Sequence, residues 1–170
     1  GLLDILLEML KEIQTEYEVF DDLTPEPAYQ DIERVMKQVE GCKGDIIIAI
    51  GGGSVMDAAK LCSVLKDADY TVKDLLQNPT LAKKQIKAVM IPTTCGTGSE
   101  ATCNAIVAIP EEQSKKGIVN ASMIPDYVIL DAQMIKKLPK SIVAATGVDA
   151  LAHCVECFTS KKATPLSDLY

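Results

Sequence analysis

The 170-residue sequence is poor in histidine, in basic residues and in long apolar runs. Its only histidine is His153, and no Ser-His-Asp arrangement is evident around it, so side-chain acid–base catalysis has little scope. A formal net charge of −7 and scattered lysines argue against nucleic acid or an anionic membrane as a partner. No apolar run approaches the roughly 18 residues that cross a bilayer.

The composition is that of an intracellular protein with one core. Residues 1–10 are amphipathic and lack the basic head and cleavage site of a signal peptide. The six cysteines lie mostly in apolar or helical stretches, which is typical of free, buried thiols in a reducing compartment. Cys154 and Cys157 form a C-x-x-C pair, but it lies within a helical pattern, so a redox function is not favoured. We therefore expect a soluble, cytoplasmic protein.

A glycine-rich turn between a strand and a helix is the most informative feature. The apolar run at 46–50 predicts a buried strand, and the glycines at 51–53 let the backbone turn sharply and approach a bound group. Ser54 and Asp57 have the spacing of a capping box, which predicts that a helix starts at Ser54. Its free amides and positive dipole end favour phosphate as a ligand. The alternative is a tight connection without a ligand.

Helices and strands alternate along most of the chain, which predicts the α/β class. Strands separated by helices favour a Rossmann-like, mostly parallel sheet with helices on both faces and ligands at the carboxyl ends of the strands. The expected helices are 2–17, 29–41 and 54–65, the expected strands are 17–20, 46–50, 87–92 and 127–131, and a hairpin is expected from 103–109 and 117–122.

The pattern changes after residue 138. Residues 141–160 are helix-like throughout, with a possible kink at Thr146 and Gly147. We expect residues 1–138 to form the α/β domain and residues 139–170 to begin a helical domain.

A second loop rich in glycine and hydroxyl side chains follows the strand at 87–92. Residues 92–102 read PTTCGTGSEAT, and such a loop offers amides and hydroxyls to a polar ligand. Both loops are expected at the carboxyl ends of strands, so together they predict a phosphate-bearing cofactor lying across the sheet. The alternative is a loop that only caps its own strand.

Asp149 and His153 are candidate metal ligands. Their i, i+4 spacing places a carboxylate and an imidazole on one helix face, close enough to share a metal ion. An ion pair or a packed core histidine is the other interpretation of this pair. Cys157 continues the same face one turn further on, where a packing role is expected.

Four stretches together resemble the iron-containing alcohol dehydrogenase family, the metal-dependent type also called group III. They are GGGSVMDAAK at 51–60, PTTCGTGSEAT at 92–102, PDYVILDAQM at 125–134 and ATGVDALAHCVECF at 145–158. Their order and spacing match the family, and four motifs in register are far more specific than any one of them. The resemblance implies a dinucleotide-binding domain followed by an all-helical metal domain, an architecture shared with dehydroquinate synthase.

The resemblance also implies roles for individual residues. Residues of the first loop match positions that hold the NAD(P) pyrophosphate, those of the second loop line the cofactor, a lysine reaches it from the hairpin, and two apolar residues pack near the nicotinamide half. The implied cofactor-binding residues are Gly52, Gly53, Ser54, Asp57, Thr93, Thr94, Thr97, Lys115, Met134 and Leu138. Asp149 and His153 match the first two of four metal ligands, for Fe²⁺ or possibly Zn²⁺. No catalytic residue beyond the metal ligands is implied.

Two departures from the family pattern accompany this resemblance. Family members have two further metal-binding histidines downstream and an additional first strand, so the sequence resembles an internal portion, less than half, of a complete member. We expect a portion of an NAD- or NADP-dependent alcohol dehydrogenase that acts on a small alcohol or aldehyde, forms a homo-oligomer when complete, and is inactive as the 170-residue chain alone. The alternatives are a sugar-phosphate cyclase of the dehydroquinate-synthase type and a non-catalytic nucleotide-binding module.

Overall fold

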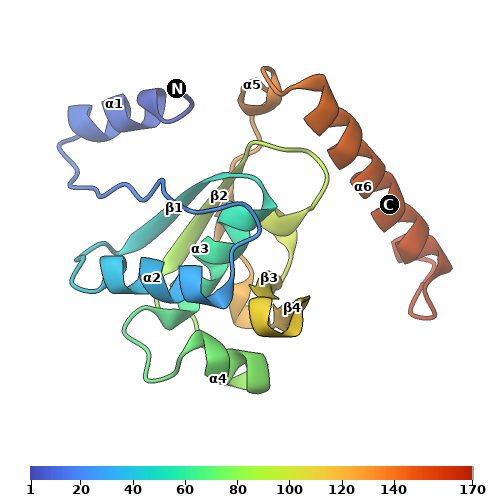
Figure 1. The fold of residues 1–170 in the computed structure, drawn as a ribbon. Helices are drawn as coiled ribbons and strands as arrows, with labels where there is room; N and C mark the ends of the chain where they lie inside the picture. Colours follow the sequence, from blue (N-terminus) through green and yellow to red (C-terminus); the bar gives the residue numbers. More distant parts are fainter. Residues whose placement is uncertain (170) are drawn as a thin grey trace.

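A three-stranded parallel sheet organises the chain in the computed structural model, which describes residues 1–169 (Figure 1). The strands β1 (Ile46–Gly51), β2 (Lys87–Pro92) and β5 (Tyr127–Val128) lie in the order β1-β2-β5. Gly51 is paired with Pro92 in the register of β1 and β2. The two glycine-rich loops therefore leave the same edge of the sheet side by side, as expected for neighbouring parallel strands.

Helix α3 (Gly53–Leu65) lies at the centre of the molecule. One of its faces packs on the sheet, with Met56 and Ala59 contacting Ala49 and Met90. Because the other face is covered as well, every residue from 56 to 65 is buried. This burial from all sides explains why α3 reads as uniformly apolar and not as a half-exposed, amphipathic helix.

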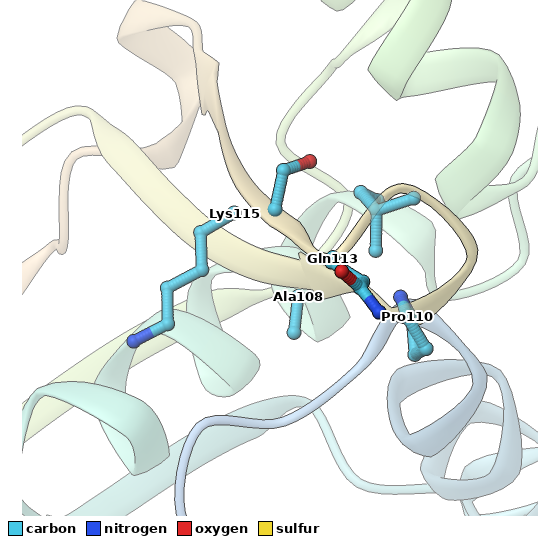
Figure 2. A pocket seen from close by; sticks show the side chains of 6 residues that line it. Ala108, Pro110, Gln113 and Lys115 are labelled. Atoms are coloured by element: carbon cyan, nitrogen blue, oxygen red, sulfur yellow. The ribbon is translucent and has the colours of Figure 1, made fainter.

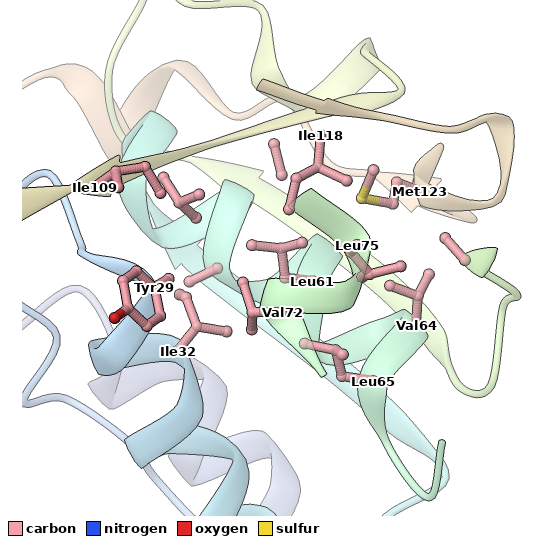
Figure 3. Packing of buried hydrophobic residues seen from close by; sticks show 14 residues of the cluster. Tyr29, Ile32, Leu61, Val64, Leu65, Val72, Leu75, Ile109, Ile118 and Met123 are labelled. Carbon is pink, nitrogen blue, oxygen red and sulfur yellow. The ribbon is translucent and has the colours of Figure 1, made fainter. Parts of the chain in front are cut away.

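The outer layer on α3 comes from two helices and a hairpin. It contains α2 (Tyr29–Val39), α4 (Val72–Gln77) and the antiparallel pair β3 (Asn104–Ile109) and β4 (Ser114–Val119). Their apolar side chains surround Leu61 in one cluster (Figure 3). Fully burying an aliphatic side chain of this kind contributes about 1.5–3 kcal/mol, so this cluster holds α3 against the hairpin.

The remaining helices lie outside this core. Helices α1 (Asp4–Glu12), α5 (Ala132–Ile135) and α6 (Lys140–Thr159) bury none of their residues within the described chain. Helix α6 begins next to the expected domain boundary at residue 138, is continuous through the expected kink, and stands apart from the sheet (Figure 1). The division into two domains stays a prediction.

Several sequence expectations meet a clear outcome in the structure. The α/β class, the parallel sheet, the strand at 87–92 and the hairpin are confirmed. The strand expected at 17–20 is absent from the described structure, because this apolar run finds no neighbouring strand to pair with. Helix α4 was missed, although Thr71 accepts a hydrogen bond from the Asp74 N–H and Asp74 accepts one from the Thr71 N–H, a reciprocal cap readable from the sequence.

The cysteines are all free, but they are less buried than expected. Only Cys62 is fully buried, and its burial raises the pKa of its thiol to about 12. Cys95, Cys154 and Cys157 are exposed. The expectation of mostly buried thiols is therefore wrong, because α6 and the loop after β2 lie outside the core.

By length and composition alone, α6 is apolar enough to cross a membrane. A search for continuous apolar runs does not reveal this, because Asp149, His153 and Glu156 interrupt the helix. One such helix is weak evidence for a membrane span, since core helices of water-soluble proteins pass the same test.

Candidate cofactor and metal site

The two glycine-rich loops pack directly against each other. The N–H of Thr93 donates a hydrogen bond to the Gly51 carbonyl at 2.9 Å. A Cβ atom on Gly52 would lie 3.2 Å from Thr94 Oγ1, and one on Gly53 would lie 3.0 Å from Thr97 Cγ2. The glycines of the first loop are therefore needed for the close approach of the second loop, in addition to any role toward a ligand.

Helix α3 begins one residue earlier than expected, and its cap is different. The N-cap is Gly52, with no side-chain cap, so the predicted capping box of Ser54 and Asp57 is wrong. Ser54 Oγ instead accepts a hydrogen bond from the N–H of Glu26 at 3.2 Å. The first amides of any helix have no acceptor within it, so the start of α3 remains a candidate anion-binding position beside the second loop.

Asp57, which the family resemblance implies as a cofactor-binding residue, lies in a buried polar network. Its carboxylate accepts hydrogen bonds from Ser99 Oγ and from the Ile106 N–H, the latter at 3.0 Å. Lys60 Nζ lies 3.0 Å from the same carboxylate. Both carboxylate oxygens are thus engaged by protein groups, and they attach α3 to the second loop and to β3.

Lys60 completes this network, and the sequence analysis did not single it out. Its side chain has no exposed surface and donates to the Asn104 carbonyl at 2.6 Å and to Thr102 Oγ1 at 3.2 Å. Burial lowers the pKa of Lys60, and the nearby Asp57 carboxylate opposes this shift. The signal in the sequence was an aspartate and a lysine three residues apart in an otherwise apolar helix.

Lys115 on β4 is connected to the start of α3 by Glu26. Its Nζ atom lies 2.6 Å from Glu26 Oε1, and the Glu26 N–H binds Ser54. Glu26 has a φ of 53° between two prolines, a conformation that is uncommon for a residue other than glycine. Sequence reasoning missed Glu26, which joins the hairpin lysine to the start of α3.

A shallow pocket on the hairpin lies beside this lysine. Figure 2 shows the side chain of Lys115 extending from the strand, away from the hairpin turn. The pocket is lined by Ala108, Ile109, Pro110, Gln113, Ser114 and Lys115. The glycine loops do not line it, so it is not the site predicted from the sequence.

The other predicted residues lie after β5 and on α6. Met134 on α5 and Leu138 are partly buried. On α6, His153 Nε2 lies 3.7 Å from Asp149 Oδ1, and both side chains are about half exposed. Within residues 1–169, no third histidine, cysteine, aspartate or glutamate joins them in a metal-binding group. Their donor atoms fit two positions of a metal site that needs more ligands.

Helix α6 approaches the second loop at Gly96. A Cβ atom on Gly96 would lie 2.5 Å from the carbonyl oxygen of Thr146, one turn before Asp149. The order in space is therefore first loop, second loop and then the helix with Asp149 and His153. This arrangement brings the predicted cofactor loops and the helix that carries the predicted metal ligands together in one α/β protein.

The comparisons with known proteins identify the family. The family model for iron-containing alcohol dehydrogenase matches residues 1–132, more than half of the chain. The chain belongs to the iron-containing alcohol dehydrogenase family. A curated relative, long-chain-alcohol dehydrogenase 1 of Geobacillus thermodenitrificans, is 37% identical over 171 residues, which cover 99% of this chain and 43% of the relative.

Solved structures extend the likeness through α6. An iron-containing alcohol dehydrogenase from Thermotoga maritima superposes with a TM-score of 0.90 at 38% identity, covering 98% of this chain and 46% of that one. A sulfoacetaldehyde reductase from Bifidobacterium kashiwanohense, solved in complex with NAD⁺, has a TM-score of 0.81 at 25% identity and covers 95% of this chain and 45% of that one. The chain thus spans less than half the length of these relatives.

Proposed function

We propose that this chain is the cofactor-binding portion, with the first metal ligands, of an NAD(P)-dependent alcohol dehydrogenase that transfers hydride between an alcohol or aldehyde and the nicotinamide. The observation that carries the proposal is that the first loop contacts the second loop, and the second loop contacts α6. At the carboxyl ends of β1 and β2, the start of α3 lies against the second loop, and the second loop lies against Thr146 of α6, three residues before Asp149. The carboxyl ends of the strands are where ligands bind in open parallel sheets.

The cofactor's phosphates belong at the start of α3. The first amides of α3 and the hydroxyls of Thr94 and Thr97, which lie beside Gly52 and Gly53, are the donors available to phosphate at the junction of the two loops. Lys115 can add a positive charge there if it leaves Glu26. The relative solved with NAD⁺ supports a nicotinamide dinucleotide, and NADP is the alternative.

Asp149 and His153 would hold the metal ion, together with ligands outside residues 1–169. A bound Fe²⁺, or Zn²⁺ in its place, supplies Lewis-acid polarisation of the substrate oxygen. The side chains present in this chain orient the two partners: α6 presents the ligand pair, and the second loop separates it from the start of α3.

We further propose that the whole protein acts in the cytoplasm as a homo-oligomer. Free thiols at all six cysteines, three of them exposed, support a reducing compartment. The names of the relatives support alcohols or aldehydes as the substrate class.

The first prediction tests the cofactor assignment in the full-length protein. Gly53→Ala places a Cβ atom 3.0 Å from Thr97, which must give by a few tenths of an ångström, and Gly53→Val adds two methyl groups where amides must approach phosphate. We expect NADH affinity to fall slightly for alanine and at least about tenfold for valine, or about 1.4 kcal/mol.

Fluorescence titration with NADH measures this effect. Gly44→Ala is the matched control, because its Cβ atom would lie 4.0 Å from its nearest neighbour and outside the site. Circular dichroism confirms that each variant is folded. Wild-type affinity in a folded Gly53→Val variant would show that phosphate does not bind at this turn.

The second prediction concerns the 170-residue chain by itself. Asp149 and His153 provide two ligands, whereas a catalytic metal site needs three or more with an open position. We expect weak metal binding and no NAD(P)-linked alcohol oxidation with added Fe²⁺ or Zn²⁺. Sustained turnover by the purified chain, followed by absorbance of NADH at its nicotinamide band, would contradict this account of the ligand set.

A further inference from the structure

Helix α6 and the second loop lie close together at Gly96, a residue without a side chain. A Cβ atom on Gly96 would lie 2.5 Å from Thr146 O, 3.0 Å from Thr146 Cβ and 3.1 Å from Thr146 C. Two of these three atoms belong to the backbone of α6, so no change of side-chain rotamer relieves the overlap. The second loop and the helix can touch here only because residue 96 is glycine.

Backbone conformation does not explain this glycine. Gly41 and Gly98 are the glycines with positive φ among residues 1–169, and Gly96 is not one of them. Gly98, two residues further on, has a φ of 61° and open space around its Cβ position. The two glycines of the same loop therefore serve different purposes: Gly98 allows a left-handed turn, and Gly96 allows contact with α6.

The second loop is attached to the sheet domain on both sides of Gly96. Before it, the Thr93 N–H binds the Gly51 carbonyl at 2.9 Å. After it, Thr97 packs on Gly53, and Ser99 is hydrogen-bonded to the buried Asp57. An added side chain at position 96 should therefore displace α6 more readily than the loop.

Displacement at Thr146 is passed directly to the proposed metal ligands. Asp149 and His153 follow Thr146 by three and seven residues on one continuous helix, or by about 4.5 and 10.5 Å of helix rise. Thr146 Oγ1 also donates to the carbonyl of Ile142, one turn earlier on the same helix, at 2.9 Å. A rigid helix moves its ligands by about as much as it moves at the contact.

We propose that Gly96 is a positioning residue that sets the separation between the metal-ligand pair on α6 and the cofactor loops. The inference rests on the proposed function, because its consequence concerns hydride transfer. Misplacing reacting groups by about 1 Å can slow a reaction by about a hundredfold, even when the substitution is remote from the reacting atoms. Substituting Gly96 should therefore lower kcat while leaving both binding sites intact.

The test compares Gly96→Ala and Gly96→Val in the full-length protein with Gly44→Ala as the control. We expect kcat to fall about 10- to 100-fold in order of side-chain size. NADH affinity should stay within about threefold of the wild-type value. Iron content should equal that of wild type within error. The deuterium isotope effect on kcat with deuterated alcohol should rise, because hydride transfer becomes slower than product release.

A crystal structure of metal-free Gly96→Ala supplies a readout that needs neither cofactor nor turnover. We expect α6 to move away from the second loop while β1 and β2 keep their positions. An unmoved α6 with a rearranged loop, or unchanged kcat in both variants, overturns the proposal. A variant with lower NADH affinity but unchanged kcat at saturating NADH would instead show that Gly96 belongs to the cofactor site. This result would also overturn the proposal. A wild-type protein that neither binds NADH nor oxidises alcohols contradicts the proposed function and, with it, the role of Gly96 in hydride transfer.

Discussion

Replacing His153 with alanine should remove the metal ion and the dehydrogenase activity of the full-length protein together. His153 supplies the imidazole of the proposed ligand pair, and its Nε2 atom lies 3.7 Å from Asp149 Oδ1. Without it, Asp149 would be the only ligand on α6 in a site that needs three or more. If metal polarisation contributes about 4 kcal/mol to the transition state, its loss slows the reaction roughly a thousandfold.

Elemental analysis and kcat measured on the same preparation decide this prediction. Cys154→Ala is the matched control, because this exposed residue follows His153 on α6 and is rotated from it by about 100°. The control should keep iron and turnover. Full iron occupancy with full activity in His153→Ala would mean that His153 is paired with Asp149 for structural reasons only, the alternative interpretation of the i, i+4 pair.

Replacing Asp57 with alanine should have the largest effect on stability. The substitution leaves Lys60 fully buried without its counter-ion, and it removes the acceptor of Ser99 Oγ and of the Ile106 N–H. Removing one partner of a buried ion pair typically costs about 3–5 kcal/mol. The attachment between α3 and the second loop is lost in the same step, so NADH affinity should fall as well.

Urea unfolding of the full-length protein measures this cost against an exposed pair. Lys116 and Glu112 form an i, i+4 ion pair at 2.7 Å with both side chains about half exposed, so Lys116→Met should cost less than about 1 kcal/mol. Asp57→Ala combined with Lys60→Met should cost less than the sum of the two single substitutions, because no uncompensated charge remains. An Asp57→Ala variant as stable as Lys116→Met would contradict the importance of the network.

The buried lysine also predicts a direction for the pH dependence. Burial lowers the pKa of Lys60 in the folded protein below its ordinary value, so between these two values the unfolded chain binds the extra proton. The free energy of unfolding contributed by Lys60 should therefore rise as the pH rises toward about 10.4. Comparing wild type with Lys60→Met across this range isolates the contribution, and an identical pH dependence in the two proteins would exclude it.

Local patterns predicted those elements that carry their own signals. The apolar run at 87–92 is β2 as expected, because a short β-branched and apolar run with a following loop favours a buried strand. The glycines at 51–53 correctly marked the junction of β1 and α3. The run at 17–20 has similar composition but is not a strand, because pairing depends on a neighbour that the local sequence does not reveal.

Side-chain partners were harder to predict than elements. Asp57 was expected to cap its helix, yet it binds Ser99, Lys60 and the Ile106 amide, which lie up to 49 residues away in the sequence. A capping box is a local arrangement, and a buried cation one turn further along the helix is a stronger partner for a carboxylate. The spacing of Ser54 and Asp57 therefore predicted the helix correctly, but the capping hydrogen bonds that it predicted do not form.

The sequence by itself determined the α/β class, the family likeness, the two glycine-rich loops and the Asp149–His153 pair, because each of these depends on spacing within a short segment. Only the tertiary structure decided that Gly52 and Gly53 make room for Thr94 and Thr97, that Lys60 lies buried against Asp57, and that Gly96 lets α6 contact the second loop. These are contacts between segments that the fold brings together. Their energies come from burial and close approach, and neither quantity can be read from a residue's neighbours along the chain.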